Sequence, residues 1–149
     1  MDQATNRCGA LLDNLARKLR VQSMAVLAPL GLRPRHLVAL TVIRGRNGIL
    51  QSELAAELQL DSTNVVGLLN ELEAEGFIER RRSATDRRRH NVLLTTAGNS
   101  RLSEAEDALD TAEASVLGTL DCTERRQLFA LLEKATTTSA EACMESFTE

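Results

Sequence analysis

Aromatic residues are scarce in this chain of 149 residues, which has no tryptophan, no tyrosine and three phenylalanines. Proteins that bind single-stranded nucleic acid stack its bases on aromatic rings, so this composition argues against such a binder. The length suits one domain, or one subunit that is completed in an oligomer, and it is too short for a barrel enzyme.

Cysteine and histidine are also sparse, and they form no ligand pattern. Cys8, Cys122 and Cys143 lie far apart and include no CxxC pair, so the sequence predicts neither a disulfide framework nor a zinc site. His90 has no second ligand at metal spacing. Paired carboxylates, a Cys/His pair and a phosphate-binding glycine loop are missing too, which argues against an enzyme. We therefore expect no catalytic residue, no metal and no cofactor.

Long apolar runs are missing as well. No stretch approaches the roughly 18 apolar residues that a membrane-spanning helix needs. The first residues, Met1, Asp2 and Gln3, lack the basic and apolar regions of a signal peptide. These observations predict a cytoplasmic protein with no membrane partner.

The net charge of −3 is small, but the charges are unevenly distributed. Residues 1–32 carry four basic and two acidic side chains, residues 33–101 eleven arginines and eight acids, and residues 102–149 three basic and eleven acidic side chains. A nucleic-acid binder needs local positive charge, which the middle segment supplies. The acidic end predicts helices that face a partner or solvent, away from phosphates.

Helical periodicity begins near the amino terminus. Leu12, Leu15 and Leu19 form an apolar stripe that predicts a helix running to about Ala28. A second, mostly apolar helix is expected over residues 34–47, because proline suits the first turn of a helix and Asn-Gly ends one.

Two short helices joined by a tight turn are expected next. The first covers residues 52–59, and the second covers residues 62–75 with Asp61 as its side-chain cap. Helical spacing directs one apolar set of the second helix inward, namely Val65, Leu68, Leu69 and Leu72. The outward set is Ser62, Thr63, Asn64, Val66, Gly67 and Asn70. This arrangement is typical of a helix-turn-helix.

The period changes after Gly76, and residues 77–95 are expected to form a β-hairpin with a long tip. Six of the sixteen arginines lie within residues 80–90, opposed there by Asp86. The arginine guanidinium group binds phosphates through two N–H donors and enters narrow minor grooves, so this tip predicts DNA binding. In an alternative interpretation, Arg80, Arg81 and Arg82 pair with nearby acids instead, namely Glu71, Glu73, Glu75 and Glu79.

Two helices are expected to complete the chain. Thr95 can cap a helix from residue 96 to about residue 119, and Asp121 with Glu124 resembles a capping box for the last helix. Each of these helices has an apolar stripe that needs a partner.

The elements and their motifs resemble the MarR family of winged helix-turn-helix transcription regulators. The most specific motifs are SELA at residues 52–55, LEAEGFIERR at residues 72–81, Asp86-Arg87-Arg88 in the hairpin tip, and Leu94-Thr95 followed by Gly98. Each motif is weak alone, but their order and spacing together are specific.

The resemblance implies a mainly α, α+β fold: a winged helix-turn-helix with a two-stranded β wing, and an all-helical dimerisation region built from both chain ends. The implied boundaries are 1–32 for the N-terminal dimerisation helix, 33–95 for the DNA-binding lobe and 96–149 for the C-terminal dimerisation helices. The resemblance also implies that the 62–75 helix lies in the DNA major groove. In the wing, it implies that Asp86 orients Arg88, which enters the minor groove.

DNA contacts are therefore expected from the outward set of the recognition helix and from the wing residues Asp86, Arg87, Arg88, Arg89 and His90. Relatives often have Arg or Thr where this chain has Val66 and Gly67. Base recognition is then expected from Thr63, Asn64 and Asn70, since an asparagine side chain can bridge the adenine edge in the major groove.

An effector site and a redox site are further expectations from the resemblance. Family members usually bind effectors between the dimerisation region and the DNA-binding lobe, where a small aromatic or anionic molecule would meet Arg17, Arg20, Arg33 or His36. The other interpretation of His36 is a hydrogen-bonded residue early in a helix. Cys8 is comparable to the reactive cysteine of the family's peroxide sensors, but those sensors also use tyrosines, which this chain lacks. The alternative for Cys8 is a small residue packed between helices.

The sequence thus predicts a homodimeric, sequence-specific regulator of transcription, and in particular a repressor that a small molecule releases from DNA. Its partner would be double-stranded DNA with a near-palindromic operator. Two alternatives stay open: a peroxide-sensing regulator that acts through Cys8, and a winged-helix module that binds protein and not DNA.

Overall fold

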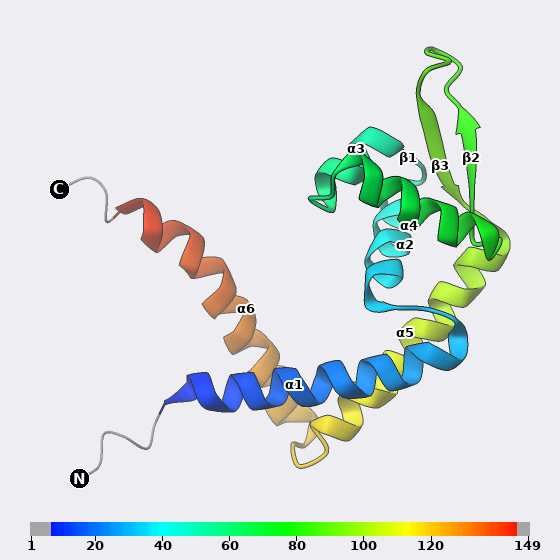
Figure 1. The fold of residues 1–149 in the computed structure, drawn as a ribbon. Coiled ribbons are helices and arrows are strands. Elements are labelled where there is room, and N and C mark those ends of the chain that lie inside the picture. Colours follow the sequence, from blue (N-terminus) through cyan, green and yellow to red (C-terminus); the bar gives the residue numbers. More distant parts are fainter. Residues whose placement is uncertain (1–6, 146–149) are drawn as a thin grey trace, which may run out of the picture. The chain divides into compact units, whose positions relative to one another are not determined.

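The computed structural model describes residues 7–145, and side chains as far as residue 137. The chain forms two compact units, one through Glu113 and one from Ala114 onward. The elements are α1 (Cys8–Leu27), the 3-10 helix η1 (Ala28–Leu30), α2 (Pro34–Arg46), β1 (Ile49–Leu50), α3 (Gln51–Glu57), α4 (Ser62–Ala74), β2 (Ile78–Arg82), β3 (His90–Leu94), α5 (Thr96–Val116) and α6 (Cys122–Glu145) (Figure 1). The predicted fold class, mainly helical with a wing, is confirmed.

The helix boundaries follow from local signals in the sequence. After α1, Pro29 lies in η1 and Gly31 adopts a left-handed backbone with φ of 71°, which glycine tolerates because it has no Cβ. Helix α2 begins at Pro34 and ends before Asn47, as predicted, and Asn47 is also left-handed. Helix α3 begins one residue before the expected Ser52 and ends at Glu57. Leu50, which precedes α3, has no side chain that could cap its first N–H groups, while the Leu50 N–H itself donates to the Glu53 carboxylate at 3.4 Å.

The sheet has three antiparallel strands in the order β1-β3-β2, one more than the predicted hairpin. The additional strand β1 has two residues, with Ile49 opposite Val92 and Leu50 opposite Asn91. Two residues are too few to create an alternating pattern, so periodicity does not reveal this strand. Its pairing brings the start of α3 beside β3 of the wing, although the paired residues Leu50 and Asn91 are 41 positions apart in sequence.

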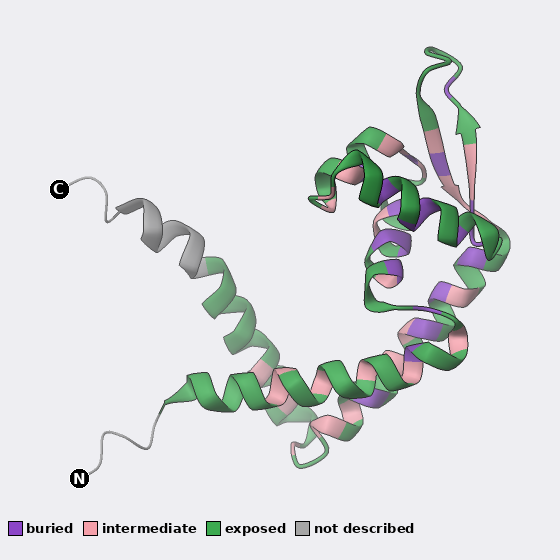
Figure 2. Ribbon diagram, in the orientation of Figure 1, coloured by how far each residue is buried: buried purple, intermediate pink, exposed green. Residues whose placement is uncertain are grey.

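The core of the first unit is formed by the end of α1, by α2, α3, α4 and the sheet, and by the beginning of α5 (Figure 2). The apolar face predicted for α4 is confirmed, because Val65, Leu68, Leu69 and Leu72 are all buried. Its partners include Leu40, Ile43, Leu54, Ile78, Val92 and Leu102. One face of α4 is therefore held by packing, and the opposite face is exposed.

The junction between the sheet and α5 is tightly packed. Thr95 caps α5 as predicted, because its Oγ1 accepts a hydrogen bond from the Gly98 N–H at 3.0 Å and donates one to the Gly76 carbonyl at 2.6 Å. Gly98 lies against the Phe77 backbone, so that a Cβ at residue 98 would be 2.0 Å from the Phe77 carbonyl oxygen. The wing is thereby attached to α5 through backbone contacts.

In the second unit, Asp121 caps α6 by accepting the Glu124 N–H at 2.8 Å. Hydrogen bonds from the Glu124 and Thr123 N–H groups lower the pKa of Asp121. None of the α6 side chains that the structure describes, Cys122 to Thr137, is buried within the chain.

None of the described helices is by itself long and apolar enough to cross a membrane. Cys8–Leu30 and Pro34–Arg46 meet that criterion only as a pair, and they are bent by 75° where they meet. The apolar residues of this pair include Leu27, Leu40 and Ile43, which are buried in the core.

Candidate nucleic-acid interface

The first turn of α4 is exposed and firmly capped. Asp61 accepts the backbone N–H of Asn64 at 2.7 Å and its side-chain Nδ2–H at 3.0 Å. The whole predicted outward set is exposed: Ser62, Thr63, Asn64, Val66, Gly67 and Asn70. A Cβ at Gly67 would have no neighbour within 4 Å, so a surface could approach this helix closely.

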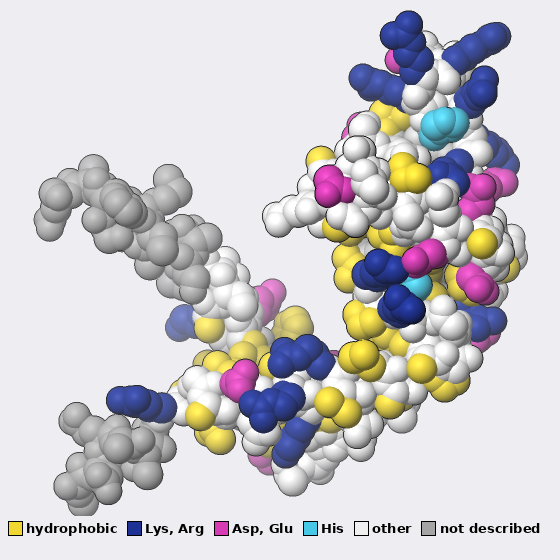
Figure 3. Space-filling model, viewed as in Figure 1, with side chains coloured by type: hydrophobic (Ala, Val, Ile, Leu, Met, Phe, Trp, Pro, Cys, Tyr) yellow, Lys and Arg dark blue, Asp and Glu magenta, His cyan; other side chains and the backbone are white. Residues whose placement is uncertain are grey.

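The wing carries its positive charge at the tip. β2 and β3 extend together beyond the helices, and arginine side chains surround the loop between them (Figures 1 and 3). Backbone hydrogen bonds from Ser83 to Arg89, at 2.9 Å, and from Arg89 to Asp86, at 3.0 Å, close this loop. Of the described side chains, none forms an ion pair or side-chain hydrogen bond with the guanidinium groups of Arg82, Arg87 and Arg88.

Asp86 forms a hydrogen bond with the backbone of Arg88 and none with its guanidinium group. Its Oδ1 accepts the Arg88 N–H at 3.0 Å, and its Oδ2 is 3.7 Å from the Nε of Arg89. The resemblance implied that the acid orients the arginine side chain. In the structure the carboxylate shapes the turn that carries Arg88, and its ion pair is with the next residue.

The root of the wing has a different electrostatic character from the tip. Arg80 donates from Nε to Glu73 at 2.7 Å and from Nη2 to Asn70 at 2.6 Å. Arg81 is 2.6 Å from Glu79. The interpretation that these arginines pair with nearby acids therefore describes Arg80 and Arg81, while Arg82 has no such partner among the described residues. The hydrogen bond from Arg80, together with its charge, lowers the pKa of Glu73.

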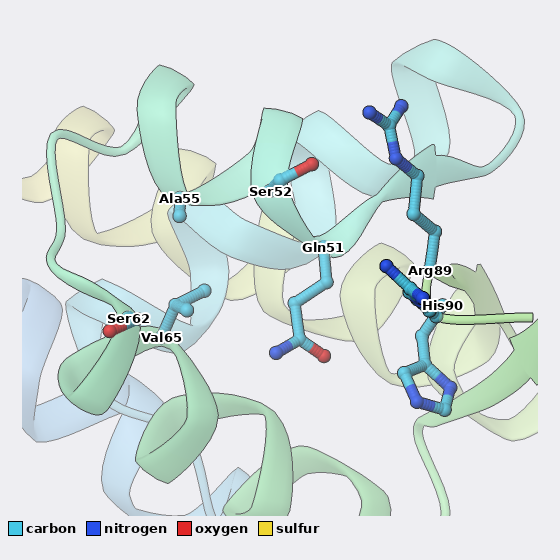
Figure 4. A pocket seen from close by; sticks show the side chains of 8 residues that line it. Gln51, Ser52, Ala55, Ser62, Val65, Arg89 and His90 are labelled. Atoms are coloured by element: carbon cyan, nitrogen blue, oxygen red, sulfur yellow. The ribbon is translucent and has the colours of Figure 1, made fainter. Parts of the chain in front are cut away.

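A hollow of about 340 Å³ joins the recognition helix to the wing. It is lined by Gln51, Ser52, Ala55, Ser62, Val65, Arg88, Arg89 and His90 (Figure 4). Gln51 points into the space between Val65 and His90 (Figure 4). Ser52 belongs to the SELA motif, but the sequence predicted no DNA contact for Ser52 or Gln51, because the short strand β1 that brings them to the wing has no sequence signal of its own.

A second hollow, of about 540 Å³, lies on another part of the first unit. Its lining includes Ala28 and Leu32 near the end of α1, Glu71 and Leu72 of α4, and Glu75 directly after α4. Of the four candidate effector residues, Arg33 and His36 line this hollow, and Arg17 and Arg20 do not. Arg17 is instead paired with Asp13 on the exposed surface of α1.

His36 is buried and hydrogen-bonded at both ring nitrogens. Its Nδ1 accepts the Arg33 N–H at 3.1 Å, and its Nε2 is 2.8 Å from the Glu71 carboxylate. The hydrogen bond from His36, supported by the charge of Arg35, lowers the pKa of Glu71. This geometry agrees with the interpretation of His36 as a satisfied residue at the start of a helix.

The two cysteines whose side chains the structure describes are free and exposed. Cys8 is exposed at the first position of α1, and Cys122 is exposed at the first position of α6. Cys143 lies beyond the described side chains. Within the part of the chain that the structure describes, no group of three His, Cys, Asp or Glu side chains is arranged to hold a metal ion.

Comparison with known proteins gives consistent matches. The family model described as MarR family matches residues 30–89. A putative transcriptional regulatory protein for the hcr operon of Thauera aromatica is 34% identical over 104 residues, which are 70% of this chain and 63% of that protein. An HTH-type transcriptional repressor of Mycobacterium tuberculosis is 30% identical over 126 residues, which are 85% of this chain and 91% of the repressor.

Solved structures show the same fold. The apo form of wild-type MarR from E. coli matches with a TM-score of 0.76 and 25% identity, over 87% of this chain and 96% of that chain. A MarR family protein of M. tuberculosis in complex with DNA matches with a TM-score of 0.75 and 28% identity, over 87% and 97% of the two chains.

Proposed function

The chain belongs to the MarR family of transcriptional regulators, and we propose that it is a homodimeric, sequence-specific repressor that binds double-stranded DNA. The observation that carries this proposal is the shared hollow, in which the start of α4 and the arginines of the wing face one space. A structure of a relative in complex with DNA supports it. We also propose that the protein is cytoplasmic.

The two DNA-facing elements suit different grooves. The exposed first turns of α4 present short polar side chains, which match the base edges of the major groove. Arg82, Arg87 and Arg88 have guanidinium groups without protein partners among the described residues, and they suit phosphates and the narrow minor groove. The hollow between these elements would take the DNA backbone that separates the two grooves, with Gln51, Ser52 and Ser62 as hydrogen-bond donors.

The exposed apolar side chains of α1 and α6 favour association with a second copy of the chain. On α1, Leu11 is 67% exposed and Val21 61%; on α6, Phe129 is 68% exposed and Leu131 65%. Residues 1–32 and 96–149 would form the dimerisation region. Two-fold symmetry then places two recognition helices on a near-palindromic site with half-sites roughly 10 bp apart.

Release by an effector is the regulatory part of the proposal. The 540 Å³ hollow is lined by the end of α4 as well as by Arg33 and His36. A small aromatic or anionic molecule bound there would contact the recognition helix directly and could alter the spacing between the two copies of it. Arg33 is the residue that would meet a carboxylate or phenolate.

The test is selection of bound sequences from random double-stranded DNA by the purified protein, followed by measurement of Kd over a range of salt concentrations. We expect one near-palindromic sequence to be enriched and its affinity to fall steeply as salt rises. A ligand screen for DNA release follows, with Arg33→Ala as the variant that should respond less. Enrichment of no sequence would contradict the proposal and favour the protein-binding alternative.

A further inference from the structure

The orientation of the Asn70 side chain is determined by its neighbour on the wing. The Nη2 of Arg80 is 2.6 Å from the Oδ1 of Asn70. A guanidinium group can only donate hydrogen bonds, so the carbonyl end of the Asn70 amide must face Arg80. The Nδ2 donors of Asn70 then lie on the other side, on the exposed face of α4.

Arg80 is itself held in place. Its side chain is 22% exposed, and its Nε donates to Glu73 at 2.7 Å in addition to the bond with Asn70. Arg80 lies on β2 opposite Val92, which is buried in the core. Two partners and a strand position therefore keep this guanidinium beside the Asn70 carbonyl.

Asn64 provides a contrast within the same helix. The Asp61 carboxylate, which can only accept, is 3.0 Å from the Nδ2 of Asn64. The carbonyl of Asn64 therefore faces away from Asp61, while the carbonyl of Asn70 is engaged by Arg80. The two exposed asparagines of α4 present opposite ends of their amides.

We propose that Arg80 is a positioning residue that makes Asn70 a hydrogen-bond donor to DNA, so that Asn70 selects guanine rather than adenine. This inference rests on the proposed function. An asparagine that reads adenine must accept from N6 and donate to N7 with one amide. With Arg80 on its oxygen, Asn70 keeps its N–H donors, and the positive charge beside the oxygen repels the adenine amino group. Guanine offers two adjacent acceptors, N7 and O6.

The experiment compares base preferences among variants in the same selection from random double-stranded DNA. Asn70→Ala identifies the position in each half-site that Asn70 reads. Arg80→Met keeps an unbranched side chain but removes the donor, and Arg80→Lys keeps a donor. Arg81→Met is the matched control, because it removes one charge from the same strand while its partner is Glu79. Circular dichroism verifies that each variant is folded.

We expect the wild type to prefer guanine at the half-site position where Asn70→Ala loses its base preference. Arg80→Met should shift that position toward adenine by at least about fivefold, the lower end of what a bidentate base contact discriminates. Arg80→Lys should retain the guanine preference, and Arg81→Met should weaken binding to all sequences without changing the pattern. A purely structural role of Arg80 would weaken binding uniformly and leave the preference unmoved.

Three results would overturn the inference. One is an adenine preference of the wild type at the position that Asn70→Ala identifies. This result requires no Arg80 variant, so the inference can be tested even if Arg80→Met does not fold. Another is an unchanged preference in folded Arg80→Met. The third is an Asn70→Ala profile identical to that of the wild type. A wild type that enriches no sequence would overturn the proposed function itself, and this inference with it.

Discussion

The Nε2 of His36 lies 2.8 Å from the Oε2 of Glu71, so the first turn of α2 is hydrogen-bonded to the recognition helix α4. Because the Nδ1 of His36 accepts the Arg33 N–H, the proton of the neutral ring is on Nε2, which donates to Glu71. Arg35 donates to both oxygens of the same carboxylate at 2.8 Å. The position of α4 relative to α2 thus depends in part on Glu71 being ionised.

A pH dependence follows from the lowered pKa of Glu71. A carboxylate whose pKa is lower in the folded state than the usual 4.5 stabilises the fold above pH 4.5. That stabilisation is lost as pH falls through the lowered folded value. We expect Glu71→Gln to lower Tm relative to the wild type at pH 7, and this difference to shrink as pH falls below 4.5 through the lowered folded pKa of Glu71.

Glu75→Gln is the control for this measurement, since Glu75 is exposed at the C-cap of the same helix and has no ion pair among the described residues. Thermal melts of the three proteins at each pH give the comparison. A Glu71→Gln difference that does not shrink as pH is lowered below 4.5 would argue against ionisation of Glu71 as its cause.

Gly98 is expected to tolerate no side chain. A Cβ there would be 2.0 Å from the Phe77 carbonyl oxygen and 2.8 Å from its carbon, and both are backbone atoms that cannot move away cheaply. We expect Gly98→Ala to lower the free energy of unfolding by about 3 kcal/mol or more, at or above the upper end of usual overpacking costs. Urea denaturation measures this change.

Gly45→Ala is the matched substitution, because Gly45 lies in α2 with open space around its Cβ position. It should raise the free energy of unfolding by roughly 0.5–1 kcal/mol, since alanine is the better helix former. Equal effects of the two substitutions would refute the close contact at Gly98.

The wing arginines should contribute unequally to DNA affinity. Arg88→Ala removes a guanidinium that has no protein partner among the described residues, so we expect weaker binding to all sequences and a shallower salt dependence, by about one in the slope of log K against log salt. Arg81→Ala should cost less, because its charge is paired with Glu79. Fluorescence anisotropy over several salt concentrations compares them, and an Arg88→Ala slope equal to that of the wild type would exclude the phosphate contact.

The exposed apolar residues of α6 should hold the dimer together. Phe129→Glu places a charge at a side chain that is 68% exposed in the single chain, so the monomer fold should persist while association is lost. Gln127→Glu adds the same charge at another exposed position of this helix and serves as the control. Analytical ultracentrifugation should find a monomer for Phe129→Glu and a dimer for the control; two dimers would mean that Phe129 is outside the interface.

Patterns within a segment predicted most of the secondary structure. Asp61 and Thr95 were identified as helix caps from short-range rules, and both form the expected hydrogen bonds. The buried face of α4 followed from its helical spacing, and the exposed arginines of the wing from their density in a polar loop. These features depend on residues three or four positions apart, whose geometry the backbone dictates once a helix or turn forms.

Contacts between distant segments were decided only by the tertiary structure. The sequence did not show that β1 would bring Gln51 beside His90, that Arg80 would take the carbonyl of Asn70, or that His36 would bond Glu71. It left the pairing of Arg80, Arg81 and Arg82 open, and packing resolved it differently for Arg80 and Arg82. Which long-range partners meet depends on strand register and on how helices pack, and neither leaves a local periodic pattern in the chain. The sequence by itself therefore determined which polar and basic residues are exposed on α4 and on the wing, while the tertiary structure decided which of them are already engaged with other residues of the protein.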